Sequence, residues 1–372
     1  MTTGAAREID VVVVGAGQAG LSAAYFLQRL GVPAERGFVV LDADAAPGGA
    51  WQHRWESLRM RTVHRIADLP GLPFEQPGPD AVAAEALPAY FAAYEERFGL
   101  PVHRPVRVRA VQEGRDERLD VLGDSGSWSA RAVVNATGTW TRPFWPYYPG
   151  RETFRGRQLH TADYRGPDEL AGRRVVVVGG GASAVQLLAE VSLVARTTWV
   201  TRRPPVWRDA PFDEEAGRAA VALVEQAVRS GRPPASVVSV TGLVESPAVA
   251  EARARGALER LPMFDRILPE GVAWADGRSL PADVILWCTG FRAALDHLAP
   301  LRLRLPAGGI AMDGTRPVGE PRLHLVGYGP SASTIGAARA GRQAAREVVA
   351  LLAGASRHAG PGDRLTLSGG AA

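Results

Sequence analysis

The chain has 372 residues, of which 46% are hydrophobic and 22% are charged, as is ordinary for a globular protein. This length exceeds what one compact core accommodates, so we expect two domains. No stretch approaches the roughly 18 apolar residues that a membrane-spanning helix needs, and we expect no membrane partner. The first strand-like run begins by Ile9, which leaves no room for a secretory signal peptide and favours a cytoplasmic location.

Four features of the composition exclude whole classes of chemistry. Cys288 is the single cysteine, so neither an intramolecular disulfide nor a CxxC redox pair can form. The absence of lysine excludes Schiff-base, pyridoxal-phosphate and Walker-type phosphate chemistry. The net charge is only +4 and the arginines alternate with acidic residues, so we expect no nucleic-acid partner. The seven histidines are dispersed without metal-ligand spacing, so we expect no metal.

The alternation of apolar runs and glycine turns predicts two βαβ units. The first has a strand at Ile9–Val14, a helix at Leu21–Leu30 and a strand at Phe38–Leu41. The pattern restarts with Arg174–Val178, Ser183–Val194 and Thr198–Thr201. Between and after these units we expect a helix at Ala81–Phe98, strands at Val106–Val111, Leu119–Leu122 and Ala132–Asn135, helices at Asp213–Arg229 and Ala248–Leu261, strands at Val284–Trp287 and Leu323–Val326, and a helix at Thr334–Leu352.

The first glycine turn, Gly15-Ala16-Gly17-Gln18-Ala19-Gly20, fits the GxGxxG pattern of dinucleotide-binding proteins. Gly15 permits a tight turn, Gly17 lets the backbone approach a pyrophosphate, and Gly20 allows close packing of helix on strand. Asp42 ends the next strand, 22 positions after Gly20, where a carboxylate can accept both hydroxyls of an adenosine ribose. We therefore expect a dinucleotide at this turn, with Gln18 and Ala19 among its contacts.

The second glycine turn, Gly179-Gly180-Gly181-Ala182-Ser183-Ala184, fits GxGxxA. Arg202 and Arg203 stand at the end of the next strand, 18 and 19 positions after Ala184. A guanidinium binds a 2′-phosphate that a carboxylate would repel, so this site favours NADPH over NADH. Two dinucleotide sites in one chain imply hydride transfer from a nicotinamide to a flavin, which assigns FAD to the first turn.

These patterns predict an α/β fold with two Rossmann-like dinucleotide-binding domains, in which the FAD domain is split by an inserted NADPH domain. We place the first part of the FAD domain at residues 1–152 and the NADPH domain at 153–283, with a helical insertion at about 210–262. The second part of the FAD domain follows at 284–352. A Gly- and Ser-rich tail at 353–372 is expected to be disordered.

A linker motif between the two turns gives the resemblance to a known family. Phe154, Gly156, His160 and Tyr164 fit FxGxxxHxxxY, which resembles the fingerprint of the class B flavoprotein monooxygenases, a family that includes the flavin-containing monooxygenases. The segment Gly48–Trp51, Ala136-Thr137-Gly138 and the stretch Gly327–Gly341 also look like that family. The tyrosine that ends the motif is more similar to the heteroatom-oxidising members than to the Baeyer–Villiger ones.

The resemblance implies that NADPH reduces FAD and that oxygen adds at flavin C4a. The resulting (hydro)peroxide would oxygenate a small molecule, with sulfur or nitrogen oxidation ahead of Baeyer–Villiger insertion. The cofactor carries this chemistry, so the protein has to orient the reactants and exclude water. The implied FAD contacts are Gly49, Trp51, Arg59, Thr62, Val108, Ala136, Thr137, Gly138, Ser333 and Thr334, and the implied NADPH contacts beyond the second turn are Thr289 and Gly290.

Several residues keep two interpretations. His160 braces the interdomain linker or takes part directly in the chemistry. Arg61 stands where many relatives carry an asparagine that holds the flavin peroxide, and it either stabilises a deprotonated peroxide or is a surface residue. Trp51 contacts the flavin or is core. The helices between Asp213 and Leu261 form an active-site lid or cover a sheet edge.

Alternative functions also stay open. One is an NAD(P)H-dependent flavin oxidoreductase that reduces a quinone or another acceptor, or an oxidase that forms peroxide. Another is a flavin redox sensor or accessory protein with little turnover. The sequence leaves the oligomeric state open, with a homodimer among the assemblies considered.

Overall fold

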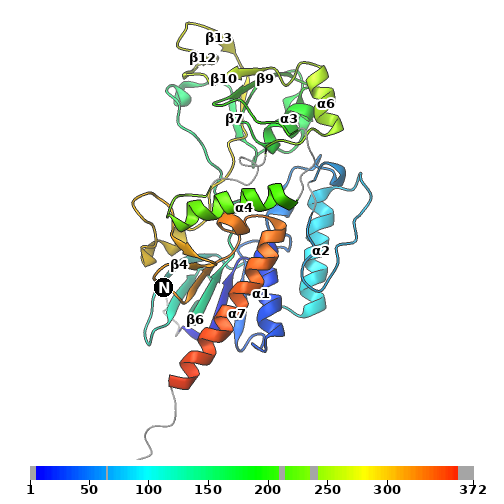
Figure 1. The fold of residues 1–372 in the computed structure, drawn as a ribbon. Helices are drawn as coiled ribbons and strands as arrows, with labels where there is room; N and C mark the ends of the chain where they lie inside the picture. Colours follow the sequence, from blue (N-terminus) through cyan, green and yellow to red (C-terminus); the bar gives the residue numbers. More distant parts are fainter. Residues whose placement is uncertain (1–5, 64–65, 209–213, 235–241, 359–372) are drawn as a thin grey trace, which may run out of the picture.

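The computed structural model describes residues 6–63, 66–208, 214–234 and 242–358 and shows two lobes stacked end to end (Figure 1). Each lobe is built on its own sheet. The chain starts in the lower lobe, crosses to the upper lobe after residue 144, and returns near residue 290 to end in the lower lobe with helix α7. This architecture confirms the predicted α/β fold with two Rossmann-like domains.

The lower lobe contains a mixed seven-stranded sheet. Its strands run in the order β3-β2-β1-β6-β5-β4, with β17 paired in parallel to β6. β1, β2, β3 and β6 are parallel, whereas β4 and β5 are antiparallel additions. The strands span Arg7–Val14 (β1), Phe38–Leu41 (β2), Val102–His103 (β3), Val108–Glu113 (β4), Leu119–Gly123 (β5), Ser127–Asn135 (β6) and Leu323–Leu325 (β17).

Helices α1 (Gln18–Arg29) and α7 (Thr334–His358) pack side by side on one face of this sheet (Figure 1). A Cβ at Gly341 would lie 2.8 Å from the backbone nitrogen of Ala23, so the two helices approach at backbone distance there. Helix α2 (Ala83–Phe98) lies beside them and completes the lobe. The alternate residues of the buried strand β1, Val11 and Val13, belong to this core and are fully buried.

The upper lobe has a five-stranded parallel sheet in the order β10-β9-β8-β14-β7. Helices α3 (Ala182–Val191) and α6 (Pro247–Ala254) pack against each other beside it, and a small antiparallel sheet of β11, β12 and β13 extends it. The strands span Arg157–His160 (β7), Arg174–Val178 (β8), Arg196–Thr201 (β9), Arg260–Pro262 (β10), Arg266–Leu268 (β11), Gly271–Ala273 (β12), Ser279–Pro281 (β13) and Val284–Trp287 (β14).

Three of the expected boundaries differ from the structure. Strand β14 pairs with β7 and β8, so the upper lobe extends through residue 287 and does not end at 283. The helix expected at Ala248–Leu261 is the shorter α6, and its last residues form strand β10 beside β9. Helix α7 continues to His358, past the expected end at Leu352, so residues 353–358 are helical. The rest of the expected disordered tail lies outside the described residues.

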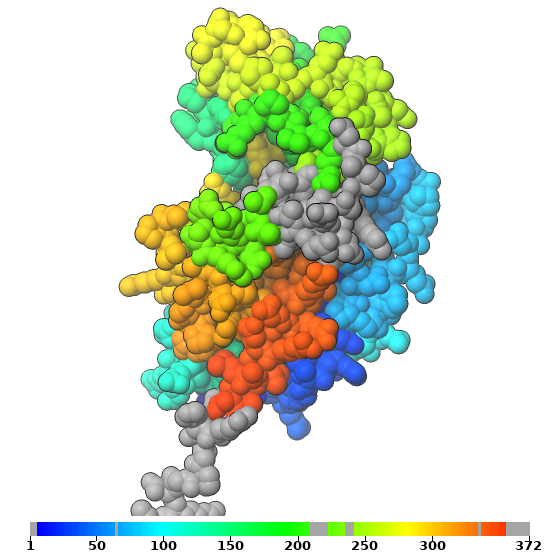
Figure 2. All heavy atoms as spheres, viewed as in Figure 1, coloured from blue at the N-terminus to red at the C-terminus, as the bar shows by residue number. Residues whose placement is uncertain are grey.

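Helix α4 (Glu214–Arg229) of the expected insertion packs on the lower lobe, whereas α6 packs in the upper lobe. It contacts β15 (Met312–Asp313) and the short helix η6 (Gly329–Ser331), and Val228 is buried in the core of the lower lobe. In the space-filling view, the end of α4 lies directly against this part of the chain, below the junction of the lobes (Figure 2). The predicted NADPH-domain insertion is therefore divided between the two lobes.

Two histidines of the lower lobe, the buried His324 and the half-buried His297, make its stability depend on pH. Burial lowers the pKa of His297 and of His324 to about 4, from an ordinary value of 6.5. His297 Nε2 lies 2.7 Å from Asn135 Oδ1, and His324 Nδ1 lies 2.8 Å from Thr315 Oγ1. Both rings are therefore neutral in the folded protein at pH values where the unfolded chain protonates them.

We predict that the free energy of unfolding falls as the pH drops from 6.5 towards 4, because the unfolded state binds more protons in that window. The loss is up to about 3 kcal/mol for each histidine. Urea unfolding of the wild type and of the His324→Gln and His297→Gln variants at pH 7 and pH 5 measures it. Each variant should lose less stability between the two pH values than the wild type, and equal losses would contradict the assignment.

Candidate functional site

The first glycine turn has the geometry of a pyrophosphate cradle. Gly15 has a φ of +99°, and a Cβ there would lie 2.7 Å from the carbonyl oxygen of Ala136. A Cβ at Gly20 would lie 1.8 Å from the oxygen of Gly15, so α1 packs too closely on β1 for any side chain. A Cβ at Gly17 would meet open space, and α1 begins directly after it. The N-terminus of α1 thus has free backbone N–H groups and room for an anion.

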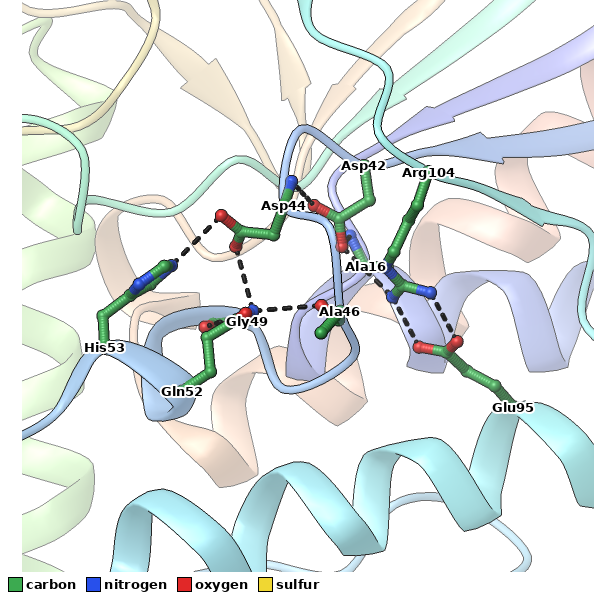
Figure 3. Close-up of polar contacts among 9 residues, drawn as sticks. All are labelled: Ala16, Asp42, Asp44, Ala46, Gly49, Gln52, His53, Glu95 and Arg104. Carbon is green, nitrogen blue, oxygen red and sulfur yellow. Dashed lines mark hydrogen bonds and ion pairs between the residues drawn. The ribbon is translucent and has the colours of Figure 1, made fainter.

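Asp42, at the end of β2, lies beside this turn, as the sequence predicts (Figure 3). Its side chain is buried and accepts hydrogen bonds from the backbone nitrogens of Ala16 at 3.3 Å and Asp44 at 3.2 Å. Burial raises the pKa of its carboxyl above the ordinary value, against the opposing effect of Arg104. These residues fit the adenosine ribose of FAD.

Two of the other predicted FAD contacts, Gly49 and Gln18, lie at the same turn. A Cβ at Gly49 would lie 2.9 Å from Gly17 Cα, so the Gly48–Trp51 segment packs directly on the cradle. Gln18 Nε2 donates to the oxygen of Ala67, which leaves the buried Gln18 Oε1 without a partner among the described residues.

Thr137, Gly138 and Ser333 hold local structure around the exits of the lower sheet. Thr137 Oγ1 donates to the oxygen of Ala294 at 2.7 Å, and Gly138 has a φ of +60°. Ser333 Oγ accepts from Gly336 N near the start of α7, whose first residue is Thr334. Val108 is the first residue of β4. The backbone oxygen of Arg59 accepts a hydrogen bond from Thr62 Oγ1. The side chain of Thr334 lies outside the described residues.

The second glycine turn repeats the arrangement in the upper lobe. Gly179 has a φ of +141°, and a Cβ there would lie 2.2 Å from the oxygen of Cys288. Helix α3 starts after Gly181, where a Cβ would again meet open space, and Ala184 is fully buried within it. Ala182 and Ser183 form the first turn of α3, next to this opening. The turn therefore fits a second dinucleotide.

Arg202 and Arg203 follow β9 and are both exposed. The backbone oxygen of Arg203 accepts a hydrogen bond from Thr201 Oγ1 at 2.7 Å, which fixes the chain at the point where it leaves the sheet. Among the described residues, no carboxylate pairs with either guanidinium. Both side chains are therefore available to an anionic ligand beside the second turn.

His160 is fully buried at the end of β7, and both ring nitrogens have partners. Nδ1 accepts from the backbone nitrogen of Ala162 at 3.1 Å, so Nε2 carries the proton and donates to the oxygen of Gly290 at 3.0 Å. Burial lowers the pKa of this imidazole, which keeps the ring neutral. These contacts fit a residue that braces the returning linker and leave no ring nitrogen free for proton transfer.

The side chain of Arg61 pairs with an exposed acidic residue and, among the described residues, with none of the other candidate site residues named above. It forms an ion pair with Asp80, and the two side chains are 57% and 77% exposed. This pair accounts for Arg61 as a surface residue of the lower lobe.

Gly156 and Phe154, the first two residues of the linker motif, have structural roles. A Cβ at Gly156 would lie 2.4 Å from the backbone oxygen of Asp283, the residue before β14. Only glycine therefore fits at this position, where the start of β7 meets β14. Phe154 packs against the core of the upper lobe. The predicted linker motif therefore runs along β7, from the residues before this strand to the turn after it.

Trp51, Arg54 and Trp140 form a cluster that the sequence did not single out as a unit. The guanidinium of Arg54 lies 4.6 Å from the Trp140 ring centroid and 5.3 Å from that of Trp51. Burial lowers the pKa of Arg54 to about 10, and its Nε has no partner among the described residues. The Trp140 ring also stacks on Phe291, which contacts His160 edge-on. An aromatic wall therefore runs from the FAD cradle to the linker.

Helix α3 joins the two lobes through Glu190. Ser57 Oγ in the lower lobe donates to Glu190 Oε1 at 2.6 Å, and the buried Tyr164 hydroxyl donates to the same oxygen. Gln186, one turn earlier, donates to the backbone oxygen of Thr62 at 2.9 Å. The helix that starts at the second glycine turn is thus hydrogen-bonded to the segment that follows the FAD cradle.

Four of the site residues were not predicted from the sequence: Arg54, Glu190, Arg104 and Glu95, the last of which pairs with Arg104 at 2.6 Å. Arg54 had one local signal, its place three residues after Trp51 in the flavin-like segment. The others take part only through contacts between distant segments, which no spacing reveals. Among the described residues no cluster of histidine, cysteine and acidic side chains could hold a metal ion. None of the described helices combines the length and apolar character needed to cross a bilayer.

Comparison with known proteins places this geometry in a family context. Residues 12–215 match the family model described as pyridine nucleotide-disulphide oxidoreductase. The chain is 30% identical over 184 residues to an uncharacterized oxidoreductase CzcO-like of Geobacillus kaustophilus, which is 50% of this chain and 51% of that protein. It is 34% identical over 202 residues to the indole-3-pyruvate monooxygenase YUCCA1 of Oryza sativa, which is 50% of this chain and 48% of that protein. The chain thus spans about half the length of these curated relatives.

The solved structures extend the likeness to nearly the whole chain. The flavin-containing monooxygenase from Stenotrophomonas maltophilia superposes with a TM-score of 0.78 at 42% identity, over 93% of this chain and 99% of that one. An open crystal structure of cyclohexanone monooxygenase superposes with a TM-score of 0.65 at 19% identity, over 94% of this chain and 88% of that one. The second likeness supports the fold alone.

We predict that Glu190→Ala destabilises the protein by about 1–3 kcal/mol, because it leaves the buried Tyr164 hydroxyl without an acceptor. Urea unfolding measures the loss. Glu225→Ala is the matched control, since Glu225 pairs with Arg229 on an exposed face of α4 and its removal should change stability by less than about 1 kcal/mol. Equal effects of the two substitutions would contradict a structural role for Glu190 between the lobes.

Proposed function

The chain belongs to the pyridine nucleotide-disulphide oxidoreductase family and, within it, to the flavin-containing monooxygenases, and from this premise we propose that it is an FAD-dependent monooxygenase that consumes NADPH and O₂. Likeness over 99% of a flavin-containing monooxygenase at 42% identity is the observation that carries the proposal. The proposed substrate is a small molecule, with oxidation at sulfur or nitrogen ahead of Baeyer–Villiger insertion. A cytoplasmic location is part of the same proposal.

Disulfide chemistry, which the family name includes, has no support in this chain. Cys288 is the single cysteine of the sequence and is 7% exposed. Burial raises the pKa of its thiol to about 12, so the reactive thiolate is not formed at neutral pH. A thiol that is unpaired, buried and protonated cannot exchange with a disulfide substrate.

When bound, FAD and NADPH supply the hydride transfer and the reaction with oxygen. The residues of this chain bind and orient these groups. The N-termini of α1 and α3 would present backbone N–H groups to the two pyrophosphates, and the guanidinium groups of Arg202 and Arg203 would bind the 2′-phosphate. Trp140 and Phe291, whose rings stack 4.9 Å apart beside the linkers, would shield the bound groups from water.

The proposal predicts that a suitable substrate diverts NADPH oxidation from H₂O₂ to oxygenated product. The measurement is the ratio of NADPH consumed to H₂O₂ released and to product formed, with an aryl methyl sulfide, a tertiary amine and a cyclic ketone supplied in parallel. H₂O₂ in equal amount to NADPH with every substrate would favour an oxidase. Oxygen-independent NADPH oxidation with a quinone would favour a reductase, and negligible turnover would favour a redox sensor.

Cofactor choice gives a separate prediction for Arg202 and Arg203. Replacing both by alanine removes charged hydrogen bonds to the 2′-phosphate, each worth about 1.5–3 kcal/mol. The KM for NADPH should rise by about tenfold or more, while the KM for NADH, which lacks the phosphate, should change little. Steady-state NADPH and NADH oxidation by the double variant checks this, and an unchanged KM for NADPH would refute the assignment.

A further inference from the structure

We propose that Arg104 is a positioning residue for FAD, which holds the Asp42 carboxylate ionised and leaves one of its acceptor positions for the adenosine ribose, and that Glu95 holds Arg104 in place. The inference rests on the proposed use of FAD and adds two residues to its binding site. Both come from outside the glycine motif. Glu95 belongs to α2, and Arg104 follows β3 at the edge of the lower sheet.

The three side chains form a buried chain of charges. Arg104 Nη2 lies 3.2 Å from Asp42 Oδ2, and its two terminal nitrogens donate to the two oxygens of Glu95 at 2.6 and 2.7 Å. The side chains of Arg104, Asp42 and Glu95 are only 10%, 8% and 12% exposed. Figure 3 shows the guanidinium between the two carboxylates, with Glu95 rising from α2 on the side opposite Asp42.

The hydrogen bonds of Asp42 use three of the acceptor positions of its carboxylate. A carboxylate offers about four acceptor positions. Oδ2 accepts from Ala16 N and Arg104 Nη2, and Oδ1 accepts from Asp44 N, so one position on Oδ1 is unused. The buried Nε of Arg104 also has no partner among the described residues. Asp42 therefore keeps one acceptor position beside the cradle for a ribose hydroxyl.

The charge of Arg104 is what allows two buried carboxylates to lie at this place. Without it, Asp42 and Glu95 would be like charges in a poorly solvated site, and one would take up a proton. A protonated Asp42 would offer a hydroxyl group in place of an acceptor. Arg104 prevents this repulsion, because its guanidinium binds both oxygens of Glu95 and also reaches Asp42.

The lower lobe contains a matched arginine that has no place near the cradle. Arg322 also bridges two carboxylates, with Nη2 at 2.7 Å from Glu320 Oε2 and at 2.9 Å from Glu113 Oε1. It lies next to β17 and pairs with the end of β4. If both arginines only stabilise the fold, their substitution should have the same effect on the Kd for FAD. If the proposal holds, only substitution of Arg104 should raise this Kd.

The test compares FAD retention with stability in four proteins: the wild-type holoprotein, Arg104→Leu/Glu95→Leu, Arg104→Lys and Arg322→Gln. The double variant removes the charge pair as a unit, and apolar replacement of a buried ion pair is often neutral for stability. Arg104→Lys keeps the charge but loses the fork. The Kd for FAD is obtained by serial dilution of the holoprotein, with the fluorescence of released FAD as the signal. Stability is measured by urea unfolding.

We expect the Kd for FAD to rise at least fivefold in the double variant and in Arg104→Lys, whether or not stability is retained. Arg322→Gln should lose stability with its Kd within twofold of wild type. Smaller changes in both Arg104 variants, or an equal rise in Arg322→Gln, overturn the proposal. If the double variant does not fold, Arg104→Lys decides alone. Wild-type protein that retains no FAD would contradict the proposed function itself.

Discussion

Backbone hydrogen bonds between two linkers determine how the lobes face each other. The outgoing segment 138–144 and the returning segment 289–294 run antiparallel, with bonds from Phe144 N to Gly290 O, from Arg292 N to Arg142 O and from Ala294 N to Gly138 O. His160, the last residue of β7, donates to the same oxygen of Gly290 and ties this pair of linkers to the upper sheet. The orientation of the two glycine turns, and so the path between two bound dinucleotides, depends on these contacts together with the hydrogen bonds that Glu190 and Gln186 of α3 make with the lower lobe.

Local sequence signals were sufficient for the two turns, because each turn is fixed by contacts within one βαβ unit. Gly15 and Gly179 must be glycine since a backbone oxygen occupies the place of their Cβ atoms, and both oxygens belong to the strand that leaves the same sheet. Asp42 could be identified for the same reason, as it ends the strand next to the turn. The α/β fold and the cradle residues could therefore be predicted from spacing alone.

Features that depend on distant contacts could not be predicted. Strand β14 is an apolar run equally suited to either lobe, and only pairing with β7 and β8 assigns it to the upper one. Gly256, whose φ is +77°, separates α6 from the short β10, and this single glycine was not used to end the expected helix. Arg104 and Glu190 are ordinary charged residues in the sequence, and their roles come from carboxylates and hydroxyls that other segments bring to them.

The placement of α4 has a consequence for the order in which the chain can fold during synthesis. Most of the upper lobe is contiguous, from β7 to β14, so its sheet can close once residue 287 has been made. The lower lobe must wait for β17, which pairs with β6, and for α7, which covers α1, while Val228 of α4 is already part of its core. During synthesis, the inserted upper lobe can therefore fold before the lower lobe, although the lower lobe contains the first residues of the chain.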